Sequence, residues 1–319
     1  MKKLDVIVVG ELNVDLILNG MESFPGLGTE IFARDMTLTL GSSSAIFANN
    51  LSKLGTEVAF VGKVGNDYFG EFIVDNLRSA RVQTDGILQT ETSQTGATIV
   101  MSYGEERANV IHPGAMETLT ISDIPTALLH EARHLHFSSY FLQPGIQQDL
   151  KHLFEAAKKA GLTTSFDIQW DPLDKWDLTL SEILPYVDIF LPNEIEAIKS
   201  TQTVSLDEAI DVLRNFGTTT IIKMGNKGSL SITKESLLHL PAYVNNQTVD
   251  AIGAGDSFNA GFISKYLKNA PIEVCQDFGN LIGALSTTAS GGTGAFSDPT
   301  GLKKIAEEKF SYDKDGFTD

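Results

Sequence analysis

Short apolar runs and amphipathic helical stretches alternate along most of the chain. Apolar runs rich in β-branched residues predict buried strands, and apolar residues repeated every three or four positions predict helices. The predicted strands are 5–9, 58–61, 135–138, 164–167, 189–191 and 219–224, a polar loop is expected at 62–67, and the predicted helices include 45–54, 69–78, 147–160, 194–199 and 206–216. Because consecutive parallel strands require crossover helices, this order predicts an α/β fold with a mostly parallel central sheet and helices on both faces.

Two regions, near residues 12–37 and 95–112, alternate apolar and polar positions without an intervening helix. From Leu12 to Leu18 every second side chain is apolar, and Asn13 and Asp15 lie on the opposite face. Strands with two different faces do not fit a sheet that is buried on both sides. We therefore expect a small β-sheet lid, whose two segments are inserted in a single α/β domain spanning residues 1–319.

The composition is that of a soluble globular protein, with 42% hydrophobic and 20% charged residues in a chain of 319. The formal net charge of −17 argues against partners such as nucleic acid and anionic membrane surfaces, which need a basic face. The single cysteine, Cys275, excludes an internal disulfide and fits a reducing compartment. No apolar run approaches transmembrane length, and we expect a cytoplasmic protein.

A glycine turn leads into a helix between Asp250 and Phe262. Gly253 and Gly255 end any strand, and the apolar residues after Asp256 have helical spacing. The free N–H groups and the positive dipole end of such a helix start bind anions, and a carboxylate among them can act as a base. A plain glycine turn before a core helix would explain the glycines but not the carboxylate.

Other patterns for nucleotide and metal sites are missing or rejected. The sequence has no G-x-G-x-x-G after its first strand and no P-loop, which argues against a dinucleotide site and a P-loop site. His130-Glu-Ala-Arg-His134 matches the zinc pattern H-E-x-x-H, which needs both histidines on one helix. The alternation that begins at His134 predicts a strand, so we expect the helix to end between the histidines and reject a zinc site.

The stretch from Asp250 to Phe262 closely resembles the C-terminal signature of the ribokinase-like (PfkB-type) carbohydrate kinases. Other stretches match that family in the right order, and they are Gly10-x-x-Asn13-x-Asp15, 54–70, 112–115, 193–196, 223–228 and the region around 290–292. The resemblance covers essentially the whole chain. It implies an ATP-dependent phosphotransferase that acts on a hydroxyl, expected to be primary, of a neutral sugar such as fructose or ribose.

The resemblance also implies roles for individual residues. Asp256 matches the catalytic base that takes the proton of the attacking hydroxyl. Gly253, Ala254 and Gly255 match the backbone anion hole that stabilises the transferring phosphoryl group, in agreement with the reading of the glycine turn.

The ligands ATP, Mg²⁺ and a monovalent cation such as K⁺ are implied in the same way. Asn193 and Glu196 match a motif linked to phosphate and, indirectly, to magnesium, although the pattern alone is more often a helix start. The implied ATP-binding residues are Asn193, Glu196, Lys223, Gly225, Gly228 and Asn280. For the monovalent cation, the implied ligands are the carboxylate of Asp250 and the carbonyls of Ile252, Ser286 and Gly291.

On the acceptor side, the matching positions are Asn13, Asp15, Gly41, Ser42, Ser43 and Ile46, with Arg107 in the lid as a candidate cation. Ile46 stands where the family usually has an asparagine, which predicts a less polar pocket. Asp171 stands near a place where many relatives have an arginine, and an acidic or phosphorylated substrate would need that cation. The departure at Asp171 therefore argues against a sugar acid or sugar phosphate.

Two alternatives remain open. The less polar wall at Ile46 would let a nucleoside base stack, so the acceptor could be a nucleoside. A catalytically silent sugar-binding sensor is the second alternative, although the retained Asp256 argues against it. The apolar face of 12–18 would need cover, and lid strands in this family often pair between subunits, so we also expect a homodimer through the lid.

Overall fold

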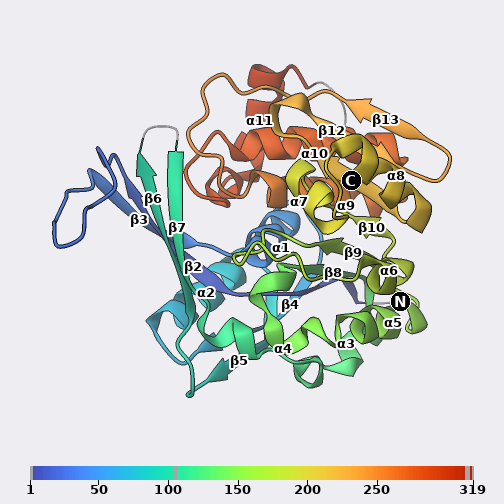
Figure 1. The fold of residues 1–319 in the computed structure, drawn as a ribbon, viewed down its shortest axis with the longest axis horizontal. Helices are drawn as coiled ribbons and strands as arrows, with labels where there is room; N and C mark the ends of the chain where they lie inside the picture. Colours follow the sequence, from blue (N-terminus) through green and yellow to red (C-terminus); the bar gives the residue numbers. More distant parts are fainter. Residues whose placement is uncertain (1–2, 104–105, 313–316, 318–319) are drawn as a thin grey trace.

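A large central sheet organises the molecule, for which a computed structural model describes residues 3–103, 106–312 and 317. Within these residues the sheet has nine strands in the order β13-β12-β11-β10-β9-β8-β1-β4-β5 (Figure 1). The strands are β1 (Leu4–Val9), β4 (Val58–Gly65), β5 (Gln83–Thr90), β8 (Ala132–Ser138), β9 (Thr163–Asp167), β10 (Ile189–Phe190), β11 (Thr219–Lys223), β12 (Ser229–Ile232) and β13 (Leu237–Leu240). From β11 to β5 all neighbours pair in parallel, and only β12 and β13 pair antiparallel. The expected mostly parallel sheet is confirmed.

Helices cover both faces of this sheet, as predicted. They are α1 (Ser43–Lys53), α2 (Tyr68–Ser79), α3 (Thr126–Glu131), α4 (Pro144–Gln147), α5 (Leu150–Lys159), α6 (Leu180–Ile183), α7 (Glu194–Ser200), α8 (Leu206–Phe216), α9 (Ala254–Tyr266), α10 (Ile272–Ser286) and α11 (Pro299–Phe310). Successive side chains of β1 lie on opposite faces of the sheet and pack in different cores. Val8 packs in the core that contains residues of α1, α2 and α9, whereas Val9 packs in the core that contains residues of α5 and α8.

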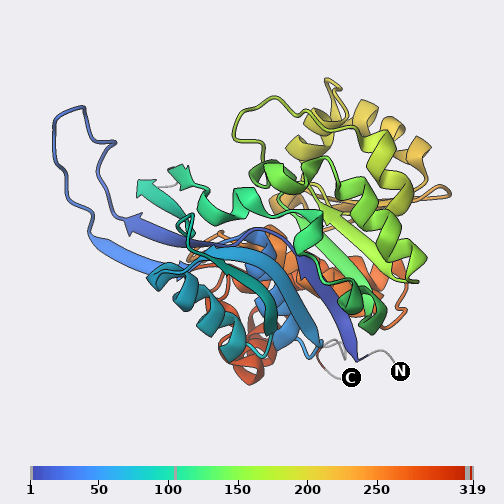
Figure 2. The same ribbon diagram turned by 90° about the horizontal axis from the view of Figure 1, so that it is seen from below.

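A second sheet of four strands, in the order β3-β2-β6-β7, projects from the side of the molecule (Figures 1 and 2). Its strands are β2 (Asn13–Asn19), β3 (Asp35–Leu40), β6 (Gly96–Tyr103) and β7 (Glu106–His112). The central pair β2–β6 is parallel and both outer pairs are antiparallel. Strands β2, β6 and β7 lie within the two segments expected to form the lid, whereas β3 runs beyond the first segment to Leu40. The long loop between β2 and β3 extends furthest from the core (Figure 2).

Several element boundaries differ from the prediction. Strand β4 continues through the expected polar loop to Gly65, because residues 61–65 pair with β5. The helix predicted at 147–160 is divided between α4 and α5. Strand β5 was not predicted, because most of its side chains are polar and several are exposed at the sheet edge.

The rejection of a zinc site is supported by the elements around the histidine pattern. Helix α3 ends at Glu131 and β8 begins at the next residue, so His130 is helical and His134 lies on a strand. No group of three histidine, cysteine, aspartate or glutamate residues in the described part of the chain could hold a metal ion. Among the same residues, no helix has the length and apolarity needed to cross a membrane.

Candidate active site

The start of α9 forms the predicted glycine turn. Gly253 caps the helix in the left-handed region, with φ of 72°, and a Cβ there would lie 2.6 Å from the Cα of Gly292. Glycine is therefore required both by the backbone angle and by the close approach of a second segment. Ala254, Gly255 and Asp256 form the first turn, where backbone N–H groups lack helical partners and attract negative charge.

The turn at Gly253 is held against helix α1 by one buried amide. Asn50 of α1 donates through Nδ2 to the hydroxyl of Ser257 (3.0 Å) and to the carbonyl of Gly292 (2.9 Å). Helix α1, helix α9 and the segment at Gly292 are thus joined at a single side chain.

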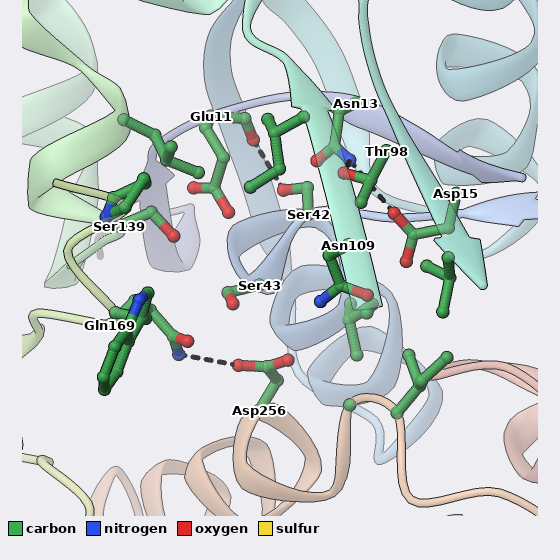
Figure 3. A pocket seen from close by; sticks show the side chains of 18 of the residues that line it. Glu11, Asn13, Asp15, Ser42, Ser43, Thr98, Asn109, Ser139, Gln169 and Asp256 are labelled. Carbon is green, nitrogen blue, oxygen red and sulfur yellow. Dashed lines mark hydrogen bonds between the residues drawn. The ribbon is translucent and has the colours of Figure 1, made fainter. Parts of the chain in front are cut away.

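Two cavities meet beside this turn. The smaller, of about 490 Å³, lies between the lid and the ends of central strands, and the larger measures about 890 Å³. Four residues line both cavities, and they are Arg107, Gln169, Gly253 and Asp256. Figure 3 shows Asp256 with its carboxylate facing the smaller cavity from the start of α9. The predicted base therefore stands where the two cavities join.

The carboxylate of Asp256 lies in a strongly charged environment. Its Oδ1 accepts a hydrogen bond of 3.1 Å from Nε2 of Gln169 (Figure 3). The same Nε2 also donates to Oδ2 of Asp167 at 2.9 Å. The pKa of Asp256 is raised to about 7, first by burial and then by the Asp167 carboxylate, against the opposing charge of Lys223. A carboxylate with this pKa can accept a proton near neutral pH.

A buried ion pair lies behind Asp256. The ammonium of Lys223, at the end of β11, contacts Oδ2 of Asp167, at the end of β9, at 2.7 Å. Burial alone would lower the pKa of Lys223, but Asp167 and Glu196 outweigh it and raise the pKa above its usual value. Lys223 also lies beside Gly255, where a Cβ would be 3.7 Å from its Nζ. A fixed positive charge thus stands next to the first turn of α9.

Asn193 and Glu196 lie on the wall of the larger cavity and also cap α7. The side chain of Asn193 accepts from the N–H of Glu196 (2.9 Å), and Oε2 of Glu196 accepts from the N–H of Asn193 (2.8 Å). Oε1 of Glu196 accepts from Nδ2 of Asn193 at 2.6 Å. The pKa of Glu196 is raised to about 8, first by burial and then by Asp167. The motif is therefore a helix start, as its pattern alone suggests, and the same two side chains also line the larger cavity.

The remaining residues expected at the nucleotide line the same cavity. Gly225, Gly228 and Asn280 all contribute to its wall. Gly228 has φ of 95°, and a Cβ there would lie 2.0 Å from the carbonyl oxygen of Leu240. The amide of Asn280, on α10, donates to the carbonyl of Pro241 at 3.2 Å.

Asp250 connects two of the segments expected to hold a monovalent cation. Its Oδ1 accepts from the N–H of Ile252 and its Oδ2 accepts from the N–H of Gly291, both at 2.9 Å. Ser286 is the last residue of α10, where its hydroxyl donates to the carbonyl of Gly283 at 2.8 Å. The structure thus brings Asp250, Ile252 and Gly291 together directly before the turn at Gly253.

Lid residues form one end of the smaller cavity. Nδ2 of Asn13 donates to the hydroxyl of Thr98 (2.8 Å) and to Oδ1 of Asp15 (3.1 Å). Burial, as the first cause, raises the pKa of Asp15 to about 6. Gly41 does not line the cavity, but a Cβ there would lie 2.3 Å from Oδ1 of Asp15. Gly41 therefore makes the room that Asp15 occupies.

The start of α1 forms the floor of this cavity. The hydroxyl of Ser42 donates to the carbonyl of Glu11 at 2.6 Å and accepts from the N–H of Ala45, so it caps the helix. Ser43 lies opposite Asp256 and lowers the pKa of that carboxyl through a side-chain hydrogen bond. Ile46 lines the cavity and packs against Gly292. A Cβ on Gly292 would lie 2.5 Å from Cδ1 of Ile46.

Asp171 has a structural role that its sequence position does not reveal. Its carboxylate accepts the backbone N–H groups of Leu173, Lys175 and Trp176 at 2.7–2.9 Å. Trp170, rather than Asp171, lines the cavity. The argument against an acidic substrate therefore cannot rest on Asp171, because this side chain stabilises its own loop.

The residues at the smaller cavity that had no role in the sequence analysis include Glu11, Ser139 and Gln169. Each follows the end of a neighbouring strand of the central sheet, respectively β1, β8 and β9. Polar residues directly after buried parallel strands are the signal that could have identified them, because ligands bind at the carboxyl edge of such sheets.

Comparison with known proteins agrees with this geometry. The sequence model described as "pfkB family carbohydrate kinase" matches residues 3–299. The chain is 27% identical over 303 residues to the 2-dehydro-3-deoxygluconokinase of Bacillus subtilis, with 91% of each chain covered. Among solved structures, it is similar to the ribokinase of Arabidopsis thaliana complexed with ribose and ATP (TM-score 0.80, 23% identity, 95% and 98% of the two chains covered). It is also similar to the adenosine kinase of Sinorhizobium meliloti (TM-score 0.82, 22% identity, 95% and 100% covered).

Proposed function

Because this chain belongs to the PfkB family of carbohydrate kinases and is thus a phosphotransferase, we propose that it transfers the γ-phosphoryl group of ATP to a neutral sugar. The acceptor group is a hydroxyl, expected to be primary, of a sugar such as fructose or ribose. The observation that carries the proposal is the position of Asp256, whose carboxylate borders both the acceptor-sized cavity and the larger cavity. Phosphoryl transfer requires the two substrates to meet at such a junction.

In the proposed reaction Asp256 takes the proton of the acceptor hydroxyl as that oxygen attacks the γ-phosphorus. The bond between the γ-phosphorus and the bridging oxygen breaks, and ADP leaves. The backbone of Gly253, Ala254 and Gly255 at the start of α9, with Lys223 beside Gly255, stabilises the negative charge on the transferring group. Gln169 fixes the orientation of the Asp256 carboxylate through its bond to Oδ1.

Ribokinase-like kinases use ATP with Mg²⁺, and the residues present fit that ion. Glu196 offers the oxygen ligands that magnesium prefers, and it lines the larger cavity. Both of its oxygens accept hydrogen bonds from Asn193, so Glu196 would hold the ion through water rather than directly. When bound, magnesium neutralises charge on the phosphates. K⁺ next to Asp250 remains part of the proposal on the strength of the family resemblance.

The charges around the smaller cavity support a neutral acceptor. Three carboxyl groups line it, those of Glu11, Asp15 and Asp256, and Arg107 is the one cationic side chain among its described lining residues. An acceptor with its own carboxylate or phosphate would meet net repulsion there. Hydroxyl groups would instead find hydrogen-bond acceptors on the carboxylates and a donor on Asn13.

A nucleoside acceptor is the second candidate. Ile46 and Trp170 give the cavity apolar surface against which a base could stack, and one similar structure is an adenosine kinase. The catalytically silent sugar sensor considered from the sequence does not fit a phosphotransferase. A sensor needs no base, and the arrangement of Asp256 with Gln169 and Lys223 favours an enzyme.

The proposal is tested by following ADP release from Mg-ATP with a panel of fructose, ribose, other neutral sugars, nucleosides and one sugar acid. We expect a neutral sugar to give the highest kcat/KM. Asp256→Asn keeps the shape of the side chain and removes the base, which lowers kcat by about 10²- to 10⁴-fold. Full turnover by Asp256→Asn would contradict the assignment of the base, and preference for a nucleoside would select the second candidate.

A further inference from the structure

The proposed phosphoryl transfer gives no individual role to one buried carboxyl group of the acceptor cavity. Glu11 follows β1, and only 1% of its surface is exposed. In Figure 3 it lies on the opposite side of the cavity from Asp15, with Ser42 between them. Burial raises the pKa of this carboxyl. A carboxyl held in this position carries a desolvation cost that calls for a compensating interaction.

Neighbouring residues hold the Glu11 side chain in one orientation. Its Oε1 accepts from the N–H of Ser44 at 3.3 Å, its Oε2 contacts the Ser44 hydroxyl, and that hydroxyl lies 2.6 Å from the hydroxyl of Ser138. Gly10 makes this arrangement possible, because a Cβ there would lie 1.8 Å from Oγ of Ser44. The carboxyl is therefore preorganised by β1, α1 and β8 together.

Backbone strain is concentrated at the same cavity. Ser42, Ser139 and Gln169 are non-glycine residues with φ of 68°, 61° and 60°, and all three line it. Such conformations are strained and cluster at ligand sites. Ser139 lies on the same side of the cavity as Glu11 in Figure 3, and a hydrogen bond from Ser139 partly offsets the rise that burial causes in the pKa of Glu11.

Capping of α1 does not account for this placement by itself. Ser42 already caps the helix through its hydroxyl, and the 3.3 Å contact from Glu11 to the N–H of Ser44 is long. A carboxyl group can accept about four hydrogen bonds. Ser44, Ser139 and the backbone of Glu11 donate to this carboxyl. The 3.3 Å bond from the N–H of Ser44 to Oε1 is weak, so Oε1 is the oxygen that can take a hydroxyl from the cavity that Glu11 lines.

We propose that Glu11 is a specificity-determining residue that binds a hydroxyl group of the acceptor, at the end of the cavity away from Asp15. The acceptor then spans the cavity, with hydroxyls bound by the lid at one end and by the sheet edge at the other. This assignment rests on the proposed kinase function and narrows its substrate class. The acceptor is a polyhydroxylated molecule with hydroxyls at both ends and no anionic group at the Glu11 end.

The test compares wild type, Glu11→Ala and Glu11→Gln on the best sugar of the panel and on its monodeoxy analogues, with kcat and KM measured separately. In wild type, removal of the hydroxyl bound by Glu11 lowers kcat/KM by about 10- to 100-fold. Glu11→Ala lowers kcat/KM for the parent sugar by a similar factor. For the analogue that lacks the bound hydroxyl, Glu11→Ala and wild type have the same kcat/KM. For each other analogue, the ratio of its kcat/KM to that of the parent sugar is the same in Glu11→Ala as in wild type. Glu11→Gln, which keeps an acceptor oxygen, recovers part of the activity.

Asp67→Asn is the matched control, because Asp67 is a carboxylate that caps α2 outside both cavities. It should lower the unfolding temperature and leave the pattern across the analogues unchanged. If Glu11→Ala behaves like this control, Glu11 is only a helix cap and the inference is wrong. If Glu11→Ala does not fold, the same set of analogues is compared between Glu11→Gln and wild type. Wild type that phosphorylates no member of the panel would overturn the proposed function itself, an outcome distinct from the failure of Glu11 alone.

Discussion

At the scale of single residues, the catalytic carboxylate determines how the rate depends on pH. Asp256 accepts a proton only when ionised, and its pKa is raised to about 7 by burial and by Asp167. We therefore expect kcat/KM to fall about tenfold per pH unit below pH 7. A profile of kcat/KM against pH, measured with the best acceptor at fixed ionic strength, tests this acidic fall. A rate that stays constant down to pH 5.5 would contradict the raised pKa.

The same shift has an effect on stability with a defined sign. Because the pKa of Asp256 is raised in the folded state, the folded protein binds this proton more tightly than the unfolded chain. The resulting stabilisation is complete below pH 4 and is lost as the pH rises through about 7. Asp256→Asn cannot ionise. Its free energy of unfolding relative to wild type should rise by about 2 kcal/mol between pH 5 and pH 8.

Urea unfolding of both proteins at the two pH values provides the measurement. A difference that does not change with pH would show that Asp256 titrates near its ordinary value. Gain of stability together with loss of turnover is the pattern expected of a strained active-site charge.

Sequence alone identified some residues of this site and missed others for a physical reason. Gly253, Ala254, Gly255 and Asp256 are consecutive, so their chemistry is visible in one short pattern. Gln169 and Asp256 are hydrogen-bonded but lie 87 residues apart in the sequence, and Glu11 and Ser44 lie 33 apart. No local sequence pattern indicates contacts between residues so far apart. Asp171 shows the converse, because a suggestive sequence position proved to be a loop cap.

At the scale of elements, the junction between β3 and α1 shapes the acceptor cavity. Gly41 follows β3, and a Cβ there would approach Oδ1 of Asp15 to 2.3 Å and Nδ2 of Asn13 to 2.8 Å. Gly41→Ala must therefore displace these two lid side chains. We expect KM for the acceptor to rise by about tenfold or more, with little change in KM for ATP, as expected for the loss of one or two hydrogen bonds.

Steady-state kinetics with each substrate varied in turn checks this expectation. Gly26→Ala is the control, because a Cβ at this position in the lid loop meets only Thr29, at 3.5 Å. Equal effects of the two substitutions would show that Gly41 has no special relation to Asp15.

Element boundaries were predictable where local signals are strong. Helix α8 spans 206–216 as predicted, because Ser205 caps its first turn and Gly217 ends it in the left-handed conformation. Strands β5, β12 and β13 were missed, since they lie toward the two edges of the sheet and their pairing partners, not their own pattern, define them. Tertiary pairing decides such strands.

At the scale of the whole molecule, the apolar face of 12–18 is not the surface that needs cover, because Leu12 and Val14 are buried in the core. The lid exposes other apolar surface that a second copy of the chain could cover. The exposed side chains in and beside the β2–β3 loop are Phe24, Leu27, Ile31, Phe32 and Met36. Leu27 and Phe32 are almost fully exposed. Surface of this kind on a lid sheet supports the proposed homodimer through the lid. Sedimentation at micromolar concentration should give about twice the chain mass of 34.6 kDa for wild type.

Leu27→Asp/Phe32→Asp should reduce the sedimenting mass to that of one chain, because charges would replace the apolar contact. Val204→Asp is the matched control, since Val204 is an exposed apolar residue between α7 and α8. A monomeric wild type would refute the dimer. The order of elements along the chain predicted the parallel sheet and the separate lid, whereas the projection of the β2–β3 loop could be learned only from the structure.

The amide of Asn50 has a consequence for timing in the catalytic cycle. By joining α1 to α9, it fixes the distance between the floor of the acceptor cavity and the phosphoryl centre before any ligand arrives. We expect the lid, rather than this frame, to be the part that rearranges when ligands bind. Motions of such covers are slow compared with side-chain rearrangements, and they often limit kcat. We therefore expect lid opening and product release, rather than the chemical step, to limit kcat.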